Sequence, residues 1–203
     1  MDKNIFNPTF QNQSTSGKIV AGLERVSEAF KVLLWEKGKE FGLSPIQIQI
    51  IIFVAYHKKE LCNVSHLAQE FNITKPTISD AIKALEAKKL ITKKVSPSDS
   101  RRYTIHLSES GKSIVSKTEN FVNPITSILN GMDESNLESL FETISTLIYQ
   151  LNQNGIISAQ RTCYGCKFFR STENKDYCTL LETELYKTDI RVDCPEFEEK
   201  LPA

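Results

Sequence analysis

The chain has 203 residues, which is room for one domain with an appendage or for two small domains. Hydrophobic residues make up 40% and charged residues 25%, as in most globular proteins, and 25 basic residues balance 25 acidic ones. No apolar run approaches the ~20 residues of a membrane helix, and the N-terminal residues lack the apolar core of a signal peptide. We therefore expect a cytoplasmic protein with no membrane segment, in which structural disulfides are disfavoured.

The first quarter of the chain is expected to hold an arm and two helices. Residues 1–17 are rich in Asn, Gln, Ser and Thr without hydrophobic periodicity, which predicts a flexible arm. From Lys18 apolar residues recur every three or four positions, which predicts an amphipathic helix ending near Gly38–Gly42. The next apolar run begins by alternating isoleucine with glutamine, as a strand does, but Ser44-Pro45-Ile46-Gln47 has the form of a capping box. We predict a helix, because the run is also long for a strand.

A helix-turn-helix is predicted after a short extended piece at Leu61–Val64. Its first helix is expected to start at a Ser65 cap and to end near Phe71. The second helix has Thr74 as N-cap and Pro76 in its first turn, where a missing N–H is harmless. Helical spacing assigns its residues to two faces. The core face is Ile78, Ala81, Ile82 and Leu85, and the solvent face is Thr77, Ser79, Asp80 and Lys83.

Two half-buried strands follow this helix, at Ile91–Val95 and Tyr103–Leu107, where apolar and polar residues alternate. The connection SPSDSRR carries turn-forming residues and ends in two arginines. The order helix, strand, basic loop, strand is that of a recognition helix followed by a wing. Residues 73–106 contain eight basic and three acidic residues, so this segment has a net charge of +5 in a neutral chain. That charge suits a phosphate backbone, and the alternative is a solvated helix face beside a lysine-rich hairpin.

Two further helices are predicted beyond the wing. Apolar residues from Ile114 to Leu129 trace a long helix that Pro124 should kink, and Asp133 should cap a last helix that runs to Leu151. Their apolar stripes, with the one on the helix from Lys18, are wider than a small core needs and predict a helical dimer interface. The alternative is that they cover their own core in a monomer. A two-fold dimer suits a palindromic operator, so we expect the dimer.

The chain changes character after Gly155, where acidic, aromatic and cysteine residues become frequent. Cys163 and Cys166 have the C-x2-C spacing that lets two thiolates converge on one ion, and Cys178 and Cys194 could complete a Zn²⁺ site. An iron–sulfur cluster is the rival, because Cys194 precedes a proline. Metal-free redox thiols, disulfides or buried thiols are further alternatives. Cys62 stands apart among apolar neighbours and is predicted to be a buried structural thiol.

Three segments resemble the MarR family of winged-helix transcriptional regulators: LSPIQIQIIIFVAY, VSHLAQEFNITKPTISDAIKALEAKKLI and DSRRYTIHLSESGK. The family wing reads D-x-R-D-x-R, followed by an L-T/S-x-x-G helix start. Asp99 and Arg101 keep the second half of the wing motif, and residues 107–111 keep the helix start, but Ser96, Pro97 and Ser98 replace the first half. The resemblance runs from about Leu43 to Gly155.

The resemblance implies a mainly α fold with a small β wing, that is, a winged helix-turn-helix with long dimerisation helices. Together with the changes in composition, it divides the chain into an arm at 1–17, a DNA-binding and dimerisation domain at 18–154, and a cysteine-rich module at 155–203. The N-terminal part of the recognition helix should face base edges, with Arg101 at the minor groove, and Lys94 and Arg102 should hold phosphates or lie along the strands. The complete set of candidate DNA contacts is Thr74, Lys75, Pro76, Thr77, Ser79, Lys83, Lys94, Arg101 and Arg102.

The sequence therefore predicts a homodimeric regulator that binds a pseudo-palindromic operator in double-stranded DNA. A small-molecule effector between the long helices and the DNA-binding lobe, or a change at the cysteine site, would alter the spacing of the two recognition helices. The alternative is a metal- or redox-handling protein whose winged helix serves protein contacts. We do not expect an enzyme, because the sequence lacks a glycine-rich phosphate loop, an H-E-x-x-H motif and a nucleophile motif.

Overall fold

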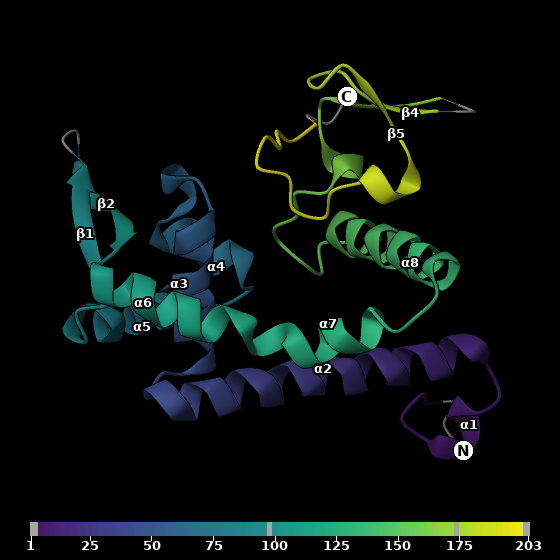
Figure 1. Ribbon diagram of the computed structural model, residues 1–203, viewed down its shortest axis with the longest axis horizontal. Helices are drawn as coiled ribbons and strands as arrows, with labels where there is room; N and C mark the ends of the chain where they lie inside the picture. Colours follow the sequence, from purple (N-terminus) through teal and green to yellow (C-terminus); the bar gives the residue numbers. More distant parts are fainter. Residues whose placement is uncertain (1–3, 97–98, 173–174, 201–203) are drawn as a thin grey trace.

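The computed structural model describes residues 4–96, 99–172 and 175–200, with the side chains of residues 96 and 99–101 left out. Within these residues no helix is both long and apolar enough to cross a membrane. The structure is mainly helical and has two small antiparallel sheets (Figure 1). The α-helices are α1 (Pro8–Gln11), α2 (Thr15–Phe41), α3 (Pro45–Tyr56), α4 (Val64–Glu70), α5 (Lys75–Ala87), α6 (Glu109–Thr118), α7 (Asn123–Leu129) and α8 (Glu134–Gln153). The strands are β1 (Ile91–Ser96), β2 (Asp99–Leu107), β3 (Phe169–Ser171), β4 (Asp176–Cys178) and β5 (Thr183–Leu185), and the 3-10 turns are η1 (Lys59–Leu61), η2 (Glu119–Val122), η3 (Cys163–Gly165) and η4 (Lys187–Asp189).

The hydrophobic core lies mostly within the part of the chain formed by α3 to α6 and the β1–β2 hairpin, and Leu34 of α2 belongs to it as well. Helix α3 packs against α2, α5, α6 and β2, so its sequence is apolar on nearly every face. Ile48, Ile50 and Ile51 are fully buried. The predicted capping box is confirmed: the Gln47 N–H donates to Ser44 Oγ at 3.4 Å, and the Ser44 N–H donates to Gln47 Oε1 at 3.0 Å. Burial on all sides explains why the sequence here resembled a strand as much as a helix.

The helix-turn-helix is formed by α4 and α5, and the start of α4 differs from the prediction. Asn63 is the N-cap in place of Ser65, because its Oδ1 accepts the His66 N–H at 3.0 Å. Of the predicted extended piece Leu61–Val64, Leu61 ends the 3-10 turn η1 and Val64 starts α4, so that Cys62 and Asn63 alone lie between the two elements. Helix α5 begins as predicted, with Thr74 as its N-cap and Pro76 in the first turn. Asn72 makes the turn between the helices with a positive φ of 51°.

The wing is an antiparallel hairpin in which Ile91 pairs with Leu107 and Val95 pairs with Tyr103. Strand β2 starts at Asp99, four residues before the predicted start, so the two arginines belong to the strand rather than to the loop. The inward-facing Ile91 and Ile105 are buried and join the hairpin to the core. The N–H of Ile105 also donates to the carbonyl of Cys62 at 2.8 Å.

The predicted kinked helix at 114–129 is two helices joined by a 3-10 turn. Helix α6 starts at a Ser108 cap and ends at Thr118, η2 follows, and α7 carries Pro124 at its N-terminus. Proline has no N–H to donate to the preceding turn, so the α-helical hydrogen bonds lapse before it and the break is wider than a kink.

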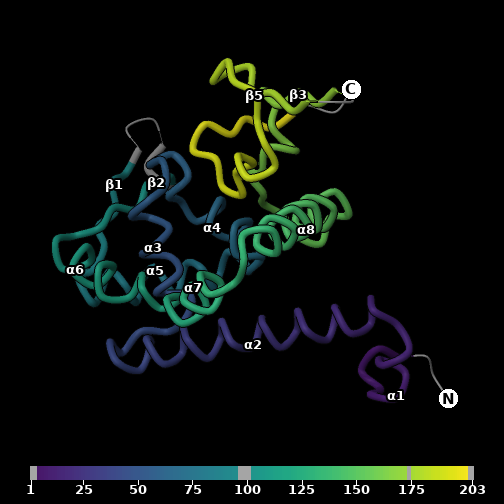
Figure 2. Tube along the Cα trace, turned by 45° about the vertical axis from the view of Figure 1, so that its right-hand side comes forward, coloured from purple at the N-terminus to yellow at the C-terminus, as the bar shows by residue number. Residues whose placement is uncertain are grey.

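The N-terminal helices also differ from the prediction. Residues 8–11 form α1 with an Asn7 cap, and α2 begins at Thr15 with a Ser14 cap, three residues before Lys18. The elements α3 to α6 and the β1–β2 hairpin are called the winged-helix part below. The N-terminal half of α2 extends away from it in both views (Figures 1 and 2). Helix α2 ends at Gly42, whose φ of 62° suits glycine.

The last part of the chain, residues 155–200, is called the C-terminal part below. It follows α8 and begins at Gly155, whose φ is 69°. It contains the sheet β3–β4–β5 and packs on α8 through η4 (Figures 1 and 2). The Tyr149 and Tyr164 rings lie 5.9 Å apart, and Lys187 Nζ lies 2.7 Å from Glu142 Oε1. These contacts fasten the segment to α8.

Candidate DNA-binding surface and cysteine cluster

The N-terminus of α5 presents several of the predicted DNA contacts together. Ile78, Ala81, Ile82 and Leu85 are buried and hold the helix on the core, as predicted. Thr74, Lys75, Pro76 and Thr77 are exposed on the first turn, and Ser79 is half-buried beside them. The Thr74 and Thr77 hydroxyl oxygens lie 2.9 Å apart. This end of the helix offers a cation and hydroxyl groups, which can contact phosphates and base edges.

Part of the positive charge of residues 73–106 is engaged in local contacts. Lys83 Nζ lies 3.0 Å from Asp80 Oδ1 in an exposed pair, which DNA could break at little cost. Lys88 Nζ donates to the carbonyl of Gly42 at 2.9 Å and so caps the C-terminal end of α2. Lys93 pairs with Glu86 at 2.5 Å. The sequence charge therefore overstates the cations available to DNA, and Lys75 is the exposed lysine at the α5 N-terminus.

The wing candidates fall into two groups. Lys94 on β1 and Arg102 on β2 are exposed. Asp99 and Arg101 lie on β2, but their side chains are outside the described part of the structure. The predicted contact of Arg101 with the minor groove therefore stays a prediction.

The four C-terminal cysteines are free thiols that line one small pocket. Cys163 is the first residue of the turn η3, Cys166 directly follows that turn, Cys178 ends β4, and Cys194 lies beyond η4. The backbone N–H of Arg191 donates to Cys163 Sγ at 3.2 Å, and Arg191 Nη1 lies 3.8 Å from Cys194 Sγ. Burial raises the pKa of Cys163 and the other three cysteines raise it further, while the N–H of Arg191 lowers it.

The four thiols line the same pocket, but their sulfur atoms are not arranged around a common point. In the described part of the chain, no three His, Cys, Asp or Glu side chains are placed to hold a metal ion as they stand. The predicted Zn²⁺ and iron–sulfur sites therefore remain predictions. Cys62 differs from these four cysteines because it is fully buried. The residue is 1% exposed, and burial raises the pKa of its thiol to about 11. Its Sγ lies 3.5 Å from the carbonyl of Lys58, as expected for an inert structural thiol.

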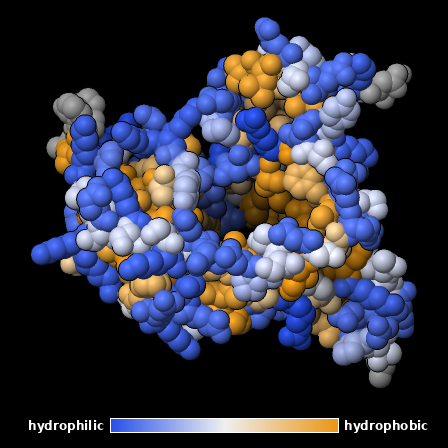
Figure 3. Space-filling model, in the orientation of Figure 1, coloured by the Kyte–Doolittle hydropathy of each residue, from blue (hydrophilic) through white to orange (hydrophobic). Residues whose placement is uncertain are grey.

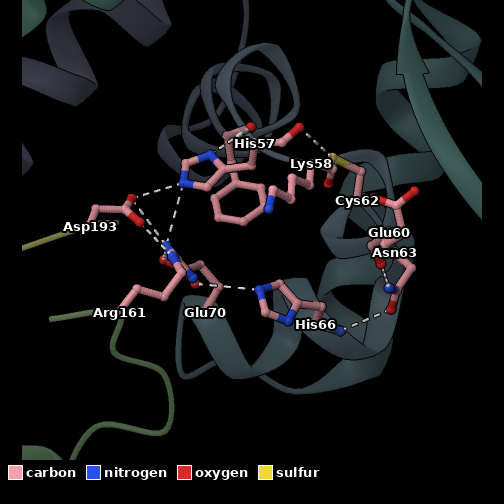
Figure 4. A network of polar contacts seen from close by, with 10 residues as sticks. His57, Lys58, Glu60, Cys62, Asn63, His66, Glu70, Arg161 and Asp193 are labelled. Atoms are coloured by element: carbon pink, nitrogen blue, oxygen red, sulfur yellow. Dashed lines mark hydrogen bonds and ion pairs between the residues drawn. The ribbon is translucent and has the colours of Figure 1, made fainter. Parts of the chain in front are cut away.

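A network of charged side chains joins the C-terminal part to the helix-turn-helix (Figure 4). Arg161 donates from Nη1 to Glu70 Oε2 at 2.7 Å and from Nη2 to Glu70 Oε1 at 3.1 Å. Its Nε donates to Asp193 Oδ1 at 2.5 Å. Glu70 is the last residue of α4, and the Arg161 side chain is 12% exposed. This guanidinium therefore ties the chain beyond α8 to the first helix of the helix-turn-helix.

His57 completes the network from the end of α3. Its Nδ1 lies 2.9 Å from the carbonyl of Phe53 and its Nε2 lies 2.8 Å from Asp193 Oδ2. Both of these partners are hydrogen-bond acceptors, which favours the protonated imidazole, whereas Arg161 Nη2 at 3.4 Å from Nε2 opposes it. Burial lowers the pKa of His57, but these hydrogen bonds outweigh it and the pKa is raised. The hydrogen bond from His57 holds the pKa of Asp193 well below its usual range, and Arg161 lowers it further against the effect of burial.

The network and the cysteine cluster share two backbone segments. Arg161 and Asp193 form a parallel β-bridge. The N–H of Cys194 donates to the carbonyl of Arg161 at 3.1 Å, and the N–H of Cys163 donates to the carbonyl of Arg191 at 3.2 Å. Sequence reasoning missed Arg161, Asp193, Glu70 and His57. The available signal was position, because Arg161 lies two residues before one predicted ligand and Asp193 directly precedes another.

A cavity of about 670 Å³ lies between the winged-helix part and the C-terminal part. His57, His66 and Gln69 line one side, and Arg161, Asp193 and Cys194 line the other. Figure 3 shows the molecule hollowed between these parts, with hydrophobic side chains on the wall towards α8. The cavity volume falls within the range of small-molecule sites.

Comparison with known proteins gives a family match over part of the chain and solved structures of the same fold. Residues 41–102 match the model of the MarR family. MepR from S. aureus in complex with DNA is 23% identical, with a TM-score of 0.58, over 65% of this chain and 97% of its own. MepR in a DNA-binding conformation is 22% identical, with a TM-score of 0.58, over 66% and 98% of the two chains. CouR from Rhodococcus jostii RHA1, bound to p-coumaroyl-CoA, is 18% identical, with a TM-score of 0.56, over 66% and 94%.

Proposed function

We propose that this protein is a transcriptional regulator of the MarR family that binds double-stranded DNA through α5 and the β1–β2 wing, and the match of residues 41–102 to the model of that family supports the proposal. The observation that supports this most is the N-terminus of α5. There Lys75, Pro76 and Thr77 are exposed while Ile78 and Ile82 fasten the helix to the core. A rigid helix that presents a cation and hydroxyl groups at its first turn is suited to reading a major groove.

The regulator acts as a homodimer in this proposal. Helix α2 exposes large apolar side chains along most of its length, among them Val26 at 50% and Trp35 at 56%. Helix α8 adds Leu140, Ile144 and Leu147, each more than a third exposed. Apolar surface of this extent is usually covered by a partner, and a second copy related by two-fold symmetry would place two α5 helices on a pseudo-palindromic operator.

The affinity for DNA is tuned from the C-terminal side in this proposal. The cavity of about 670 Å³ lies where a small-molecule effector would contact both His66 of α4 and the Arg161–Asp193 pair. A change at the cysteines would reach the same pair, because Cys194 directly follows Asp193. Either event would move α4, and with it α5, relative to the second copy.

The competing function is a metal- or redox-handling protein whose winged helix binds other proteins. The four gathered cysteines are the observation in its favour. Selection of bound duplexes from a randomised pool with the full chain separates the two functions. A regulator enriches a two-fold symmetric sequence, and its affinity falls linearly with salt concentration on logarithmic axes. Recovery of no enriched sequence and no salt-dependent duplex binding would contradict our proposal.

A further inference from the structure

We propose that Cys163, Cys166, Cys178 and Cys194 together bind one thiophilic divalent metal ion of the Zn²⁺ class, and that this ion holds the C-terminal part together. The inference does not depend on DNA binding. It rests on the convergence of the four cysteines, on the hydrogen bonds around them, on the size of their pocket and on the small core of this part of the chain.

The cysteines converge from three separate segments. Cys163 and Cys166 belong to a C-x2-C turn in which the Cys166 N–H donates to the carbonyl of Cys163 at 2.9 Å. Strand pairing places Cys178 opposite Phe169, three residues beyond Cys166. The N–H of Cys194 is tied to Arg161, two residues before Cys163, at 3.1 Å. All four side chains line the same pocket. This is the ligand number of a structural zinc site, which is usually closed by four protein side chains.

The surroundings of the sulfur atoms favour thiolates bound to a cation. The Arg191 N–H points at Cys163 Sγ from 3.2 Å, and the Arg191 guanidinium lies 3.8 Å from Cys194 Sγ. Hydrogen bonds to ligand sulfur atoms orient the ligands of a metal and disperse their negative charge. The rest of the wall is mostly apolar and also includes Arg191 and Glu196; its apolar members are Phe168, Phe169, Leu180, Leu181 and Leu185.

The size of the pocket favours a single ion over a cluster. Its volume is about 20 Å³, which accommodates one water-sized sphere. An iron–sulfur cluster has several iron and sulfide atoms and would need a larger space. The thiols are not close enough to hold an ion as they stand in the described structure, so binding requires them to close to Zn–S distances of about 2.3 Å.

The C-terminal part has little core of its own, which gives a metal a structural role. Among its described residues, the buried hydrophobic side chains are Cys166 and Ile190. Leu180 and Leu181 beside the pocket are 44% and 47% exposed. A segment of this size with so few buried side chains usually needs disulfides or a metal to stay folded, and its cysteines are free thiols.

The test is metal analysis of the full chain purified without oxygen, with acid-labile sulfide measured on the same sample. We expect about one zinc ion per chain and no sulfide. Titration of the metal-depleted chain with Co²⁺ should give the visible bands of a tetrahedral thiolate site and saturate at about one equivalent. Cys163→Ser and Cys178→Ser should each weaken metal binding by more than ~100-fold, because even outer hydrogen-bond partners of metal ligands contribute 10–100-fold. Cys62→Ala is the matched control and should keep the metal.

Three results would overturn the proposal. Iron with sulfide would replace the single ion by a cluster. Protein that stays metal-free after growth and purification with added Zn²⁺, and whose C-terminal thiols all react rapidly with a thiol reagent, would show that no metal is bound. Co²⁺ bands that survive in Cys178→Ser would remove that residue from the site. The Co²⁺ titration uses the natural sequence, so it decides the question even if the serine variants misfold.

Discussion

Arg161 binds both carboxylate oxygens of Glu70, at 2.7 Å from Nη1 and 3.1 Å from Nη2. The two residues are 91 positions apart, and they join the chain beyond α8 to the last residue of α4. Planar two-point contacts of this kind hold orientation as well as distance. The helix-turn-helix and the C-terminal part are therefore expected to move as one unit.

Replacing Arg161 by methionine should loosen this unit. Arg161→Met keeps most of the side-chain volume but leaves Glu70 and Asp193 without their cation, so we expect the free energy of unfolding to fall by about 3 kcal/mol. Urea unfolding measures the loss, and hydrogen exchange should rise in α4 and at residues 191–194. Lys58→Ala is the control, because Lys58 joins the same two parts through a half-exposed pair with Glu196 at 2.9 Å. Its loss should stay below about 1 kcal/mol, and an equal loss in both variants would refute the role given to Arg161.

Lys75 should contribute to DNA binding through charge. For Lys75→Ala we expect weaker binding to all duplexes and a salt slope shallower by about 1, because one phosphate contact is lost. Thr77→Ala should instead cost about 1–3 kcal/mol at one base pair of the operator. Fluorescence anisotropy across a salt series separates the two effects. Lys187→Ala removes a lysine that pairs with Glu142 far from α5, and binding that weakens as much in this variant would contradict the docking of α5.

The sequence was sufficient where the decisive contacts are local. The Thr74 cap, the buried face of α5 and the Ser44 capping box involve residues within one or two helical turns, and spacing alone predicted them. The start of α4 was missed because Asn63 and Ser65 can both cap a helix, and only the packing of α4 decides between them. The break before Pro124 was underestimated for a similar reason, since propensity does not say how far a helix unwinds.

The candidate sites also combine features that can be predicted from the sequence with features that depend on the fold. The C-x2-C pair is visible in the sequence, but the approach of Cys178 and Cys194 depends on strand pairing and on the bridge between Arg161 and Asp193. The position of Arg161 near Cys163 was visible in the sequence, but its pairing with Glu70 was not, because charged residues are frequent and their partners lie in another part of the fold. The local engagement of Lys88 with the Gly42 carbonyl was equally hidden, although it removes one cation from the predicted DNA surface.

Gly111 should be irreplaceable at the start of α6. A Cβ atom there would lie 2.0 Å from the backbone carbonyl oxygen of Leu90, and the Gly111 N–H binds the Ser108 cap at 3.0 Å. Gly111→Ala should therefore separate α6 from the start of the wing and lower the free energy of unfolding by about 3 kcal/mol. The matched control is Gly22→Ala in α2, where a Cβ would meet no described atom within 4 Å. That change should raise stability by about 0.5–1 kcal/mol in thermal unfolding, and equal effects in the two variants would contradict the close approach.

A charge on the exposed face of α2 should disrupt the dimer. Val26 is 50% exposed within the apolar face of α2, so Val26→Asp would bury a carboxylate at the proposed interface and shift the equilibrium towards monomers. Sedimentation over a range of concentrations measures the shift. Val95→Asp is the control, because Val95 is 53% exposed on the wing and should not affect assembly. A natural chain that sediments as a monomer at all concentrations would rule out the dimer.

Removal of the metal should change DNA affinity through Arg161. Chelation would free Cys163 and Cys194, whose backbone hydrogen bonds hold Arg161 and Asp193 side by side, and the change would pass to Glu70 in α4. We expect duplex affinity to change by about 5–150-fold on chelation in the natural chain, the usual range for coupled sites. In Arg161→Met the same treatment should change affinity far less, because the link is already cut, and anisotropy titrations of the four samples give the coupling directly. An equal response to chelation in both chains would show that Arg161 does not carry the signal, and no response in the natural chain would leave the metal a purely structural role.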